Sequence, residues 1–199
     1  MSKSWKEIGE ELTHLIREDE AFRTTLASTG ELFHTAYHPA MEKMHLKHAQ
    51  RLKEILEEKD TFPTMDLVGE EACTAALKII LHAISDPEFL RAQEASLVDL
   101  ARANKVPKAY VANLVDRICV YEGRKQVYAT YADWDENGIM RYPDVEDEEH
   151  LNERRASMDL EPLESLVITP LTGEYHPPNP QKRYEEFQEW TQKVGWRKT

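Results

Sequence analysis

The sequence predicts a mainly α-helical protein: a bundle of about five helices with a small β-hairpin and an extended C-terminal tail. Up to Cys119, apolar side chains recur every three or four positions, which is the period of a helix with one buried face. A segment rich in β-forming residues, 126–131, then precedes a strong turn signal at 135–138. From Thr169 onward prolines interrupt the pattern, and a last helical stretch surrounds Phe187.

The predicted helices have recognisable starts. Ser4 is a suitable N-cap for the first helix, expected over 4–26. Pro39 opens the second, because proline lacks an N–H that the first helical turn leaves unused. The other three helices are expected over 69–84, from Pro87 to Asn104, and from Pro107 to Cys119.

These elements define the expected domain organisation. Residues 1–166 are expected to form one helical domain, with the hairpin near 124–142 and a short charged helix over 146–157. Residues 167–199 are expected to form a tail that wraps the domain and carries one short helix.

Composition restricts the possible partners. The chain has 25 basic and 37 acidic residues, a net charge of −12. Phosphate backbones and acidic membrane surfaces are bound through lysine and arginine, so neither nucleic acid nor a membrane is expected as a partner. A small-molecule substrate is the expected partner, and the oligomeric state is not defined by the sequence. Two charge runs, 17–20 and 154–155, are typical of solvated helix faces.

The two cysteines and the N-terminal pattern indicate where in the cell the protein is expected to reside. Cys73 and Cys119 are each flanked by apolar residues and are expected to be buried thiols in a reducing compartment. The N-terminal residues lead into an amphipathic pattern and not into an apolar segment of the kind that directs secretion. The expected location is therefore the cytoplasm.

Histidines in and after the second helix are the candidate catalytic residues, because imidazole titrates near neutral pH. His45 and His48 lie on the apolar stripe of the second helix and are expected to face inward. His82 lies in the last turn of the third helix, whose C-terminus favours the imidazolium form. We predict that His45 and His82 transfer protons and that Asp116 orients one imidazole. The alternative interpretation is a set of core histidines that only form hydrogen bonds.

A metal site is another interpretation of the same region. Two Glu-x-x-His pairs, at 31–34 and 42–45, have the spacing used in di-iron helical bundles. The fifth helix offers Asp116 in place of an inward glutamate, so no particular metal or cofactor is assigned. The donors would be three imidazoles and one carboxylate, from His38, His45, His82 and either Glu42 or Glu31.

A second group of polar residues is expected to bind the substrate. Asp116-Arg117 interrupts an apolar helix, and such charges are costly to bury unless paired, which indicates either a structural ion pair or an anchor for an anion. Alternation over 124–130 predicts a strand with one polar face, either solvated or a wall of the substrate site. The predicted substrate-binding residues are Tyr37, His38, Arg117, Arg124, Gln126, Tyr128 and Thr130.

Several catalytic signatures are absent from the sequence. It contains no Gly-x-x-x-x-Gly-Lys loop, no Gly-x-Gly-x-x-Gly, no Gly-x-Ser-x-Gly, no His-Glu-x-x-His and no Cys-x-x-Cys. These absences argue against nucleotide-fold enzymes, common serine hydrolases, zincins and thiol oxidoreductases.

Short motifs follow one another along the chain. They include Tyr37-His38-Pro39-x-Met41-x-x-x-His45, His82-Ala83-Ile84-x-Asp86-Pro87-x-Phe89, Asp116-Arg117-Ile118 and Glu122-Gly123-Arg124-x-Gln126-x-Tyr128-x-Thr130. Over about 10–166 this series resembles a large, uncharacterised bacterial family catalogued only as a domain of unknown function. The resemblance implies a site near these residues but supplies no reaction.

The chain departs from that family pattern at three places. Thr61-Phe62-Pro63 stands where the family usually has Gly-Trp-Pro, and Leu81 stands where it has glutamine. The run 128–131 replaces Tyr-Gly-Thr-Gln. If the missing amides hold a substrate, the resemblance implies altered specificity or weaker activity.

The leading hypothesis is a small cytoplasmic enzyme that uses histidine acid–base chemistry on a small polar or anionic molecule, as a hydrolase, lyase or biosynthetic tailoring enzyme. The first alternative is a metal-dependent helical oxygenase or hydrolase. The second is a non-catalytic interaction module, whose acidic surface and 190–196 tail would contact a partner.

Overall fold

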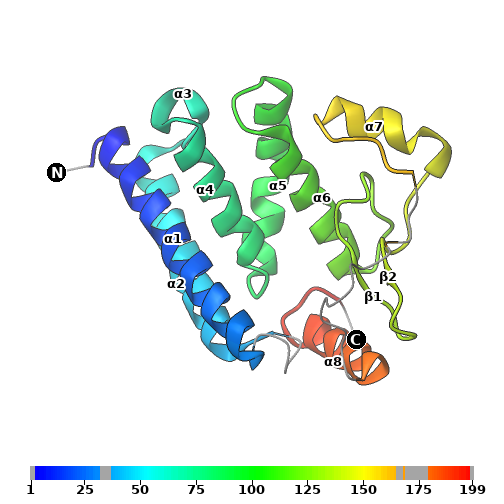
Figure 1. Ribbon diagram of the computed structural model, residues 1–199. Coiled ribbons are helices and arrows are strands. Elements are labelled where there is room, and N and C mark those ends of the chain that lie inside the picture. The colour runs from blue at the N-terminus through cyan, green and yellow to red at the C-terminus, as the bar shows by residue number, and fades with distance from the viewer. Residues whose placement is uncertain (1–2, 32–36, 165–167, 169–178, 198–199) are drawn as a thin grey trace. The chain divides into compact units, whose positions relative to one another are not determined.

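The computed structural model describes residues 3–31, 37–164, 168 and 179–197 (Figure 1). The described residues are mainly α-helical, with eight α-helices and one two-stranded antiparallel hairpin. This confirms the predicted fold class, with somewhat more helices than predicted. Internal contacts divide the chain into two compact units, 1–111 and 112–199, and each is described by itself.

The first unit contains five helices and the start of a sixth. The predicted starts are confirmed: Ser4 caps the first helix, and the second begins at Pro39. The Glu7 carboxylate accepts from the Ser4 N–H at 2.8 Å, and the Ser4 hydroxyl accepts from the Glu7 N–H at 3.3 Å, which completes a capping box. The helices are α1 (Trp5–Thr29), α2 (Pro39–Lys59), α3 (Met65–Val68), α4 (Glu70–His82), α5 (Pro87–Arg102) and α6 (Lys108–Glu122), which crosses into the second unit.

Helices α1, α2 and α4 pack against one another and enclose much of the core of this unit (Figure 1). Helices α1 and α4 approach closely at Gly9, where an added Cβ would lie 3.3 Å from both the Ala72 Cβ and the Val68 carbonyl oxygen. At this point α1 therefore lies close to both α4 and the end of α3. Fully buried members of this core include Ile8, Leu12, Leu52, Ile55, Leu77 and Ile80.

The end of α4 and the start of α5 lie close together in sequence. His82 lies in the last turn of α4, as predicted, and is its last residue, although the helix was expected to continue to about position 84. Asp86 caps α5 by accepting from the Phe89 N–H at 3.2 Å, and Pro87 occupies the first turn. This short connection between α4 and α5 therefore restricts the position of His82 at the end of α4.

The second unit contains the rest of α6, β1 (Asp133–Trp134), β2 (Met140–Arg141), the 3-10 helix η2 (Glu148–His150), α7 (Leu151–Ser157) and α8 (Pro180–Lys193). The predicted hairpin is present, with strands shorter than the span of 124–142. In its turn, the Asp135 carboxylate accepts from the N–H groups of Asn137 and Ile139, both at 2.9 Å. Gly138 has a φ of 78°, a conformation that glycine adopts without strain.

The predicted strand over 124–130 is wrong. The segment instead turns around the side chain of Asp116, which accepts hydrogen bonds from the N–H groups of Val127, Tyr128 and Thr130. Ala129 has a φ of 52°, in the left-handed region, so the extended alternation is broken there. The four alternating residues therefore do not share the face of a strand.

The described end of the tail packs on α6 within the second unit. The Tyr121 ring centroid lies 5.3 Å from that of Trp196 and 5.5 Å from that of Phe187. Arg197 donates to the carbonyl oxygens of Val120 and Tyr121, both at 2.9 Å. These contacts make residues near the C-terminus part of the core of this unit.

Two further observations concern the extent of the described chain. None of the described helices is long and apolar enough to cross a membrane. The proline-rich run at 170–178 and the histidine of the 31–34 pair lie outside the described residues.

Candidate functional site

Three helices of the first unit bring one carboxylate and two imidazoles together. Asp19 comes from α1, His45 from α2 and His82 from the last turn of α4. His45 Nε2 lies 2.9 Å from Asp19 Oδ1, and His82 Nδ1 is hydrogen-bonded to Asp19 Oδ2. The two imidazole centroids lie 4.9 Å apart. Two rings that carry protons therefore share one carboxylate.

Tyr37, just before α2, joins this group. Its hydroxyl oxygen lies 2.5 Å from His45 Nδ1, and the hydroxyl donates to the carbonyl oxygen of His82 at 3.2 Å. The Tyr37 ring also stacks on His45, with centroids 5.8 Å apart. Both nitrogens of His45 are thus engaged, which fixes the orientation of the ring.

Burial differs across the cluster formed by Tyr37, Asp19, His45 and His82. Asp19 is 1% exposed and His45 is 6% exposed, whereas 30% of the His82 side chain is exposed. Burial would raise the pKa of Asp19, but hydrogen bonds and positive charge from the two histidines outweigh it and hold this pKa well below its usual range. Asp19 is therefore ionised at neutral pH, and His82 is the imidazole that a small molecule can reach.

The positions of the protons follow from the charge of Asp19. An ionised carboxylate only accepts hydrogen bonds, so His45 Nε2 and His82 Nδ1 must carry the protons that face it. A neutral His45 accepts the Tyr37 hydroxyl proton at Nδ1. A charged His45 donates to the Tyr37 oxygen, and that hydroxyl then donates to the His82 carbonyl. The cluster accommodates both charge states without moving a heavy atom.

His48 is a second inward histidine of α2, as the apolar stripe predicts, and it is 2% exposed. Its Nε2 lies 3.9 Å from Glu18 Oε2. Burial lowers the pKa of His48, and the negative charges of Asp19 and Glu18 oppose this shift only in part. His48 is therefore held in its neutral form.

The same cluster contains the residues best placed to hold a metal ion. Asp19, His45 and His82 each present one ligand atom, and these atoms all lie within 4.8 Å of one another. Carboxylate oxygen and imidazole nitrogen are ligands of zinc and of other divalent transition metals. Two of the three predicted imidazoles are in this set.

The other predicted metal ligands have different partners. His38 is the N-cap residue of α2, and its ring lies edge-on against Phe22, with centroids 6.4 Å apart. Glu42 accepts from the Ser85 hydroxyl at 2.5 Å, and Glu31 is exposed. The carboxylate of the cluster is Asp19, which the sequence-based prediction did not include.

Asp116 lies in the second unit and holds the loop that follows α6. It accepts from three backbone N–H groups and from the Thr130 hydroxyl, at 2.7–3.0 Å. Gln126 donates to the carbonyls of Tyr131 and Pro143 and accepts from the Tyr131 N–H. Both side chains are fully buried, and these hydrogen bonds hold this loop. The role predicted for Asp116, orienting an imidazole, is filled by Asp19.

Two predicted anion-binding arginines also have partners within the second unit. The Arg117 guanidinium lies over the Tyr131 ring, 5.8 Å from its centroid, and Arg124 donates to Glu122 at 2.8 Å. Arg124 lies on the wall of a cavity of about 480 Å³. Because three arginines and four carboxylates line this cavity, its charge does not favour an anion.

Arg155 was expected on a solvated helix face, and that prediction is wrong. It is 7% exposed and donates to the carbonyls of Tyr128, Ala129 and Glu161. Burial lowers the pKa of its guanidinium. The loop after α6 is therefore held by an acceptor, Asp116, on one side and a donor, Arg155, on the other.

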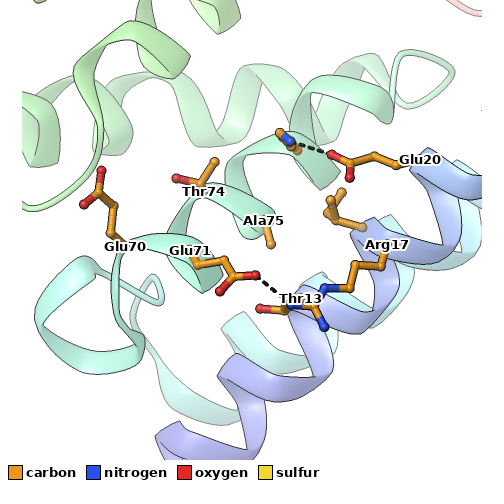
Figure 2. Close-up of a pocket in the computed structure, with 9 residues that line it drawn as sticks. Thr13, Arg17, Glu20, Glu70, Glu71, Thr74 and Ala75 are labelled. Atoms are coloured by element: carbon orange, nitrogen blue, oxygen red, sulfur yellow. Dashed lines mark hydrogen bonds and ion pairs between the residues drawn. The ribbon is translucent and has the colours of Figure 1, made fainter.

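Figure 2 shows a surface groove of the first unit between α1 and α4, with a volume of about 530 Å³. Its charges lie largely in two ion pairs, Arg17 with Glu71 at 3.0 Å and Lys78 with Glu20 at 2.6 Å. Glu70 adds a further negative charge. The groove therefore offers no net positive charge to an anion.

Asp19 is the candidate site residue that the sequence-based prediction missed, because it lies within the charge run at 17–20. The buried residues of α1 include Ile8, Leu12, Ile16, Asp19 and Leu26, so Asp19 continues the inward stripe. Its three charged neighbours in the run are exposed. The expectation of a solvated face is therefore wrong for Asp19. Its spacing of three residues from the buried Ile16 indicated that Asp19 lies on the buried face of the helix.

The chain is a mainly helical protein in which two histidines share one buried carboxylate. Residues 6–175 match the model of a family of unknown function, DUF6624, and the chain belongs to that family. The match extends slightly beyond the range of about 10–166 expected from the motifs. No match was found among curated proteins or among solved structures.

Proposed function

We propose that this protein is a cytoplasmic enzyme that uses the Tyr37–Asp19–His45–His82 cluster for acid–base chemistry on a small polar or anionic molecule. One observation carries the proposal: His45 Nε2 and His82 Nδ1 are in hydrogen-bond contact with opposite oxygens of Asp19, with ring centroids 4.9 Å apart. Two titratable rings held at fixed separation by one buried carboxylate are suited to giving and taking protons.

The exposure of each group suggests its role. His82 is the partly exposed member and would exchange a proton with the substrate. Asp19 would stabilise the imidazolium that forms, since its carboxylate remains ionised. His45 and Tyr37 would hold Asp19 and the His82 backbone in place through their own hydrogen bonds. His82 is thus the proposed catalytic residue, and Asp19, His45 and Tyr37 are positioning residues.

Other features are compatible with this proposal. Cys73 and Cys119 are both buried thiols, as a reducing cytoplasm would allow. The interaction-module alternative predicts that the chemical groups are scattered. Tyr37, His45 and His82 meet at one point, which supports a site there, whereas Asp116 and Gln126 contact the loop after α6.

The proposal is tested first without a substrate. In metal-free protein labelled with ¹⁵N at histidine, NMR should detect a proton on His45 Nε2 and a strongly deshielded proton on His82 Nδ1. Both signals should change in Asp19→Asn, because the amide nitrogen replaces one acceptor oxygen. Absence of protons on the two nitrogens that face Asp19 would contradict the proposed roles.

The second test measures turnover of phosphate monoesters, carboxylic esters, amides and hydroxy acids. His82→Gln should lower kcat by about 10²–10⁴, the usual contribution of a general acid or base, with an unchanged unfolding midpoint. His14→Gln is the matched control, because His14 lies on α1, is paired with Glu18 and has a 71% exposed side chain. Equal activity of His82→Gln and the wild type would refute the proposal.

A further inference from the structure

We propose that Asp19, His45 and His82 also form a binding site for a divalent transition-metal ion, with Nε2 of His45, Nδ1 of His82 and one Asp19 oxygen as ligands. The candidate ligand atoms belong to three different helices and lie within 4.8 Å of one another. Because packing of α1, α2 and α4 holds them, the donors are assembled before an ion arrives.

An ion requires the three side chains to move apart. Zinc binds imidazole nitrogen and carboxylate oxygen at about 2.0–2.2 Å, so two ligands of a tetrahedral ion lie about 3.4 Å apart. His45 Nε2 and Asp19 Oδ1 are 2.9 Å apart and must separate by about 0.5 Å. His82 Nδ1 is in closer contact with Asp19 Oδ2 and must move further, and its ring is the partly exposed one of the two.

The partner of the second His45 nitrogen suits the metal-bound form. With an ion on Nε2, a neutral His45 carries its proton on Nδ1 and donates it to the Tyr37 oxygen, while the Tyr37 hydroxyl donates to the His82 carbonyl. Metal-bound histidines usually donate their other N–H to such an acceptor.

The access to the site and the type of its donor atoms limit which ions it can bind. His82 is the exposed side of the cluster, so an ion can enter there and water can complete its coordination. Two imidazoles with one carboxylate suit Zn²⁺, Fe²⁺ or Co²⁺, whereas Mg²⁺ and Ca²⁺ prefer oxygen ligands throughout. The site therefore belongs to the two-histidine, one-carboxylate class with open positions.

This inference goes beyond the proposed acid–base function and is independent of it. Acid–base chemistry at this cluster needs protons on His45 Nε2 and His82 Nδ1, whereas an ion takes the place of both protons. Metal binding would therefore regulate the site or give it a second chemistry. The NMR experiment on metal-free protein reports on the protons, and the following titration reports on the ion.

The test is a titration of tag-free, chelator-treated full-length protein with Zn²⁺ by calorimetry and with Co²⁺ by visible absorption. We expect one ion per chain, cobalt bands of a low-coordinate nitrogen and oxygen site, and ¹⁵N shifts at His45 Nε2 and His82 Nδ1. Asp19→Asn and His82→Gln should each weaken binding by at least about 100-fold, more than loss of an outer-sphere partner costs. His14→Gln, a surface histidine beside a glutamate, should bind as the wild type does.

Two results would overturn the proposal. One is no binding of either ion to the wild type. The other is binding that persists in both Asp19→Asn and His82→Gln, which would place the ion at the surface. The ¹⁵N shifts need no variant, so the test remains decisive even if a substitution unfolds the chain.

Discussion

The candidate site depends on Asp19, because its carboxylate joins the two imidazoles. Asp19 is ionised although it lies on the buried face of α1, where the other side chains are apolar. Burying a charge costs several kcal/mol unless it is paired and hydrogen-bonded. Here both oxygens accept from imidazoles. A leucine at position 19 would leave both imidazole N–H groups without this acceptor, so Asp19 also stabilises the two histidines in the folded chain.

His48 should make the protein less stable in mild acid. Burial lowers its pKa in the folded state, so below about pH 6.5 the unfolded chain binds this proton more readily than the native protein. The free energy of unfolding should therefore fall as the pH decreases from about 7 to about 5. In His48→Gln this loss should be smaller, as measured by urea unfolding across the same interval.

The control for this prediction is His14→Gln, whose exposed side chain should leave the pH dependence of the wild type unchanged. A His48→Gln variant that loses as much stability in mild acid as the wild type would show that other groups cause the loss. Glu18 and Asp19 face His48, and their partial opposition to the burial effect is already included in its lowered pKa.

At the scale of elements, Asp116 accepts hydrogen bonds from the backbone N–H groups of the loop after α6. In a sheet, the carbonyl groups of a neighbouring strand would accept them. Asp116→Asn should destabilise the protein by about 1–3 kcal/mol, because an amide nitrogen faces N–H donors that are then left unsatisfied. Chemical denaturation measures this loss. Hydrogen exchange should also show faster exchange at the N–H groups of Val127, Tyr128 and Thr130.

Asp144→Asn is the matched control for this element, since Asp144 lies on the same unit with an exposed side chain. It should change the free energy of unfolding by less than about 0.5 kcal/mol. Unchanged exchange in Asp116→Asn would mean that Arg155 and Gln126 hold the loop without Asp116.

The helices could be predicted from sequence, and the strand could not, for a physical reason. The start of α2 at Pro39 and the cap of α5 at Asp86 depend on local chemistry, which the sequence displays directly. The segment 126–131 has β-forming residues, but a buried carboxylate 11–14 positions earlier takes its N–H groups. Propensity is overridden wherever a stronger partner for the backbone lies outside the segment.

At the scale of the whole molecule, two of the three central residues of the site could be predicted, and the third could not. His45 and His82 were recognisable from their residue type and helical position. Asp19 lies 26 and 63 positions from its two partners and within a run of charges. Which carboxylate meets the imidazoles depends on how helices pack, and that information is not local.

The net charge of −12 gives a prediction for the whole chain. Raising NaCl from about 0.02 M to about 0.3 M should increase the thermal midpoint by about 2–4 °C, because screening weakens the repulsion among excess carboxylates. Differential scanning calorimetry measures the midpoint, and KCl should act equally. A midpoint that falls with salt would show that surface ion pairs outweigh the repulsion.

The sharing of Asp19 between two distant histidines also has a consequence for the order of folding. The charge of Asp19 is compensated only after α1, α2 and α4 have docked, since its partners come from the other two helices. Forming these contacts early would require closing long stretches of chain around a desolvated charge. The site should therefore assemble late, after the apolar surfaces of the helices have met, and its hydrogen bonds should slow unfolding more than they speed folding.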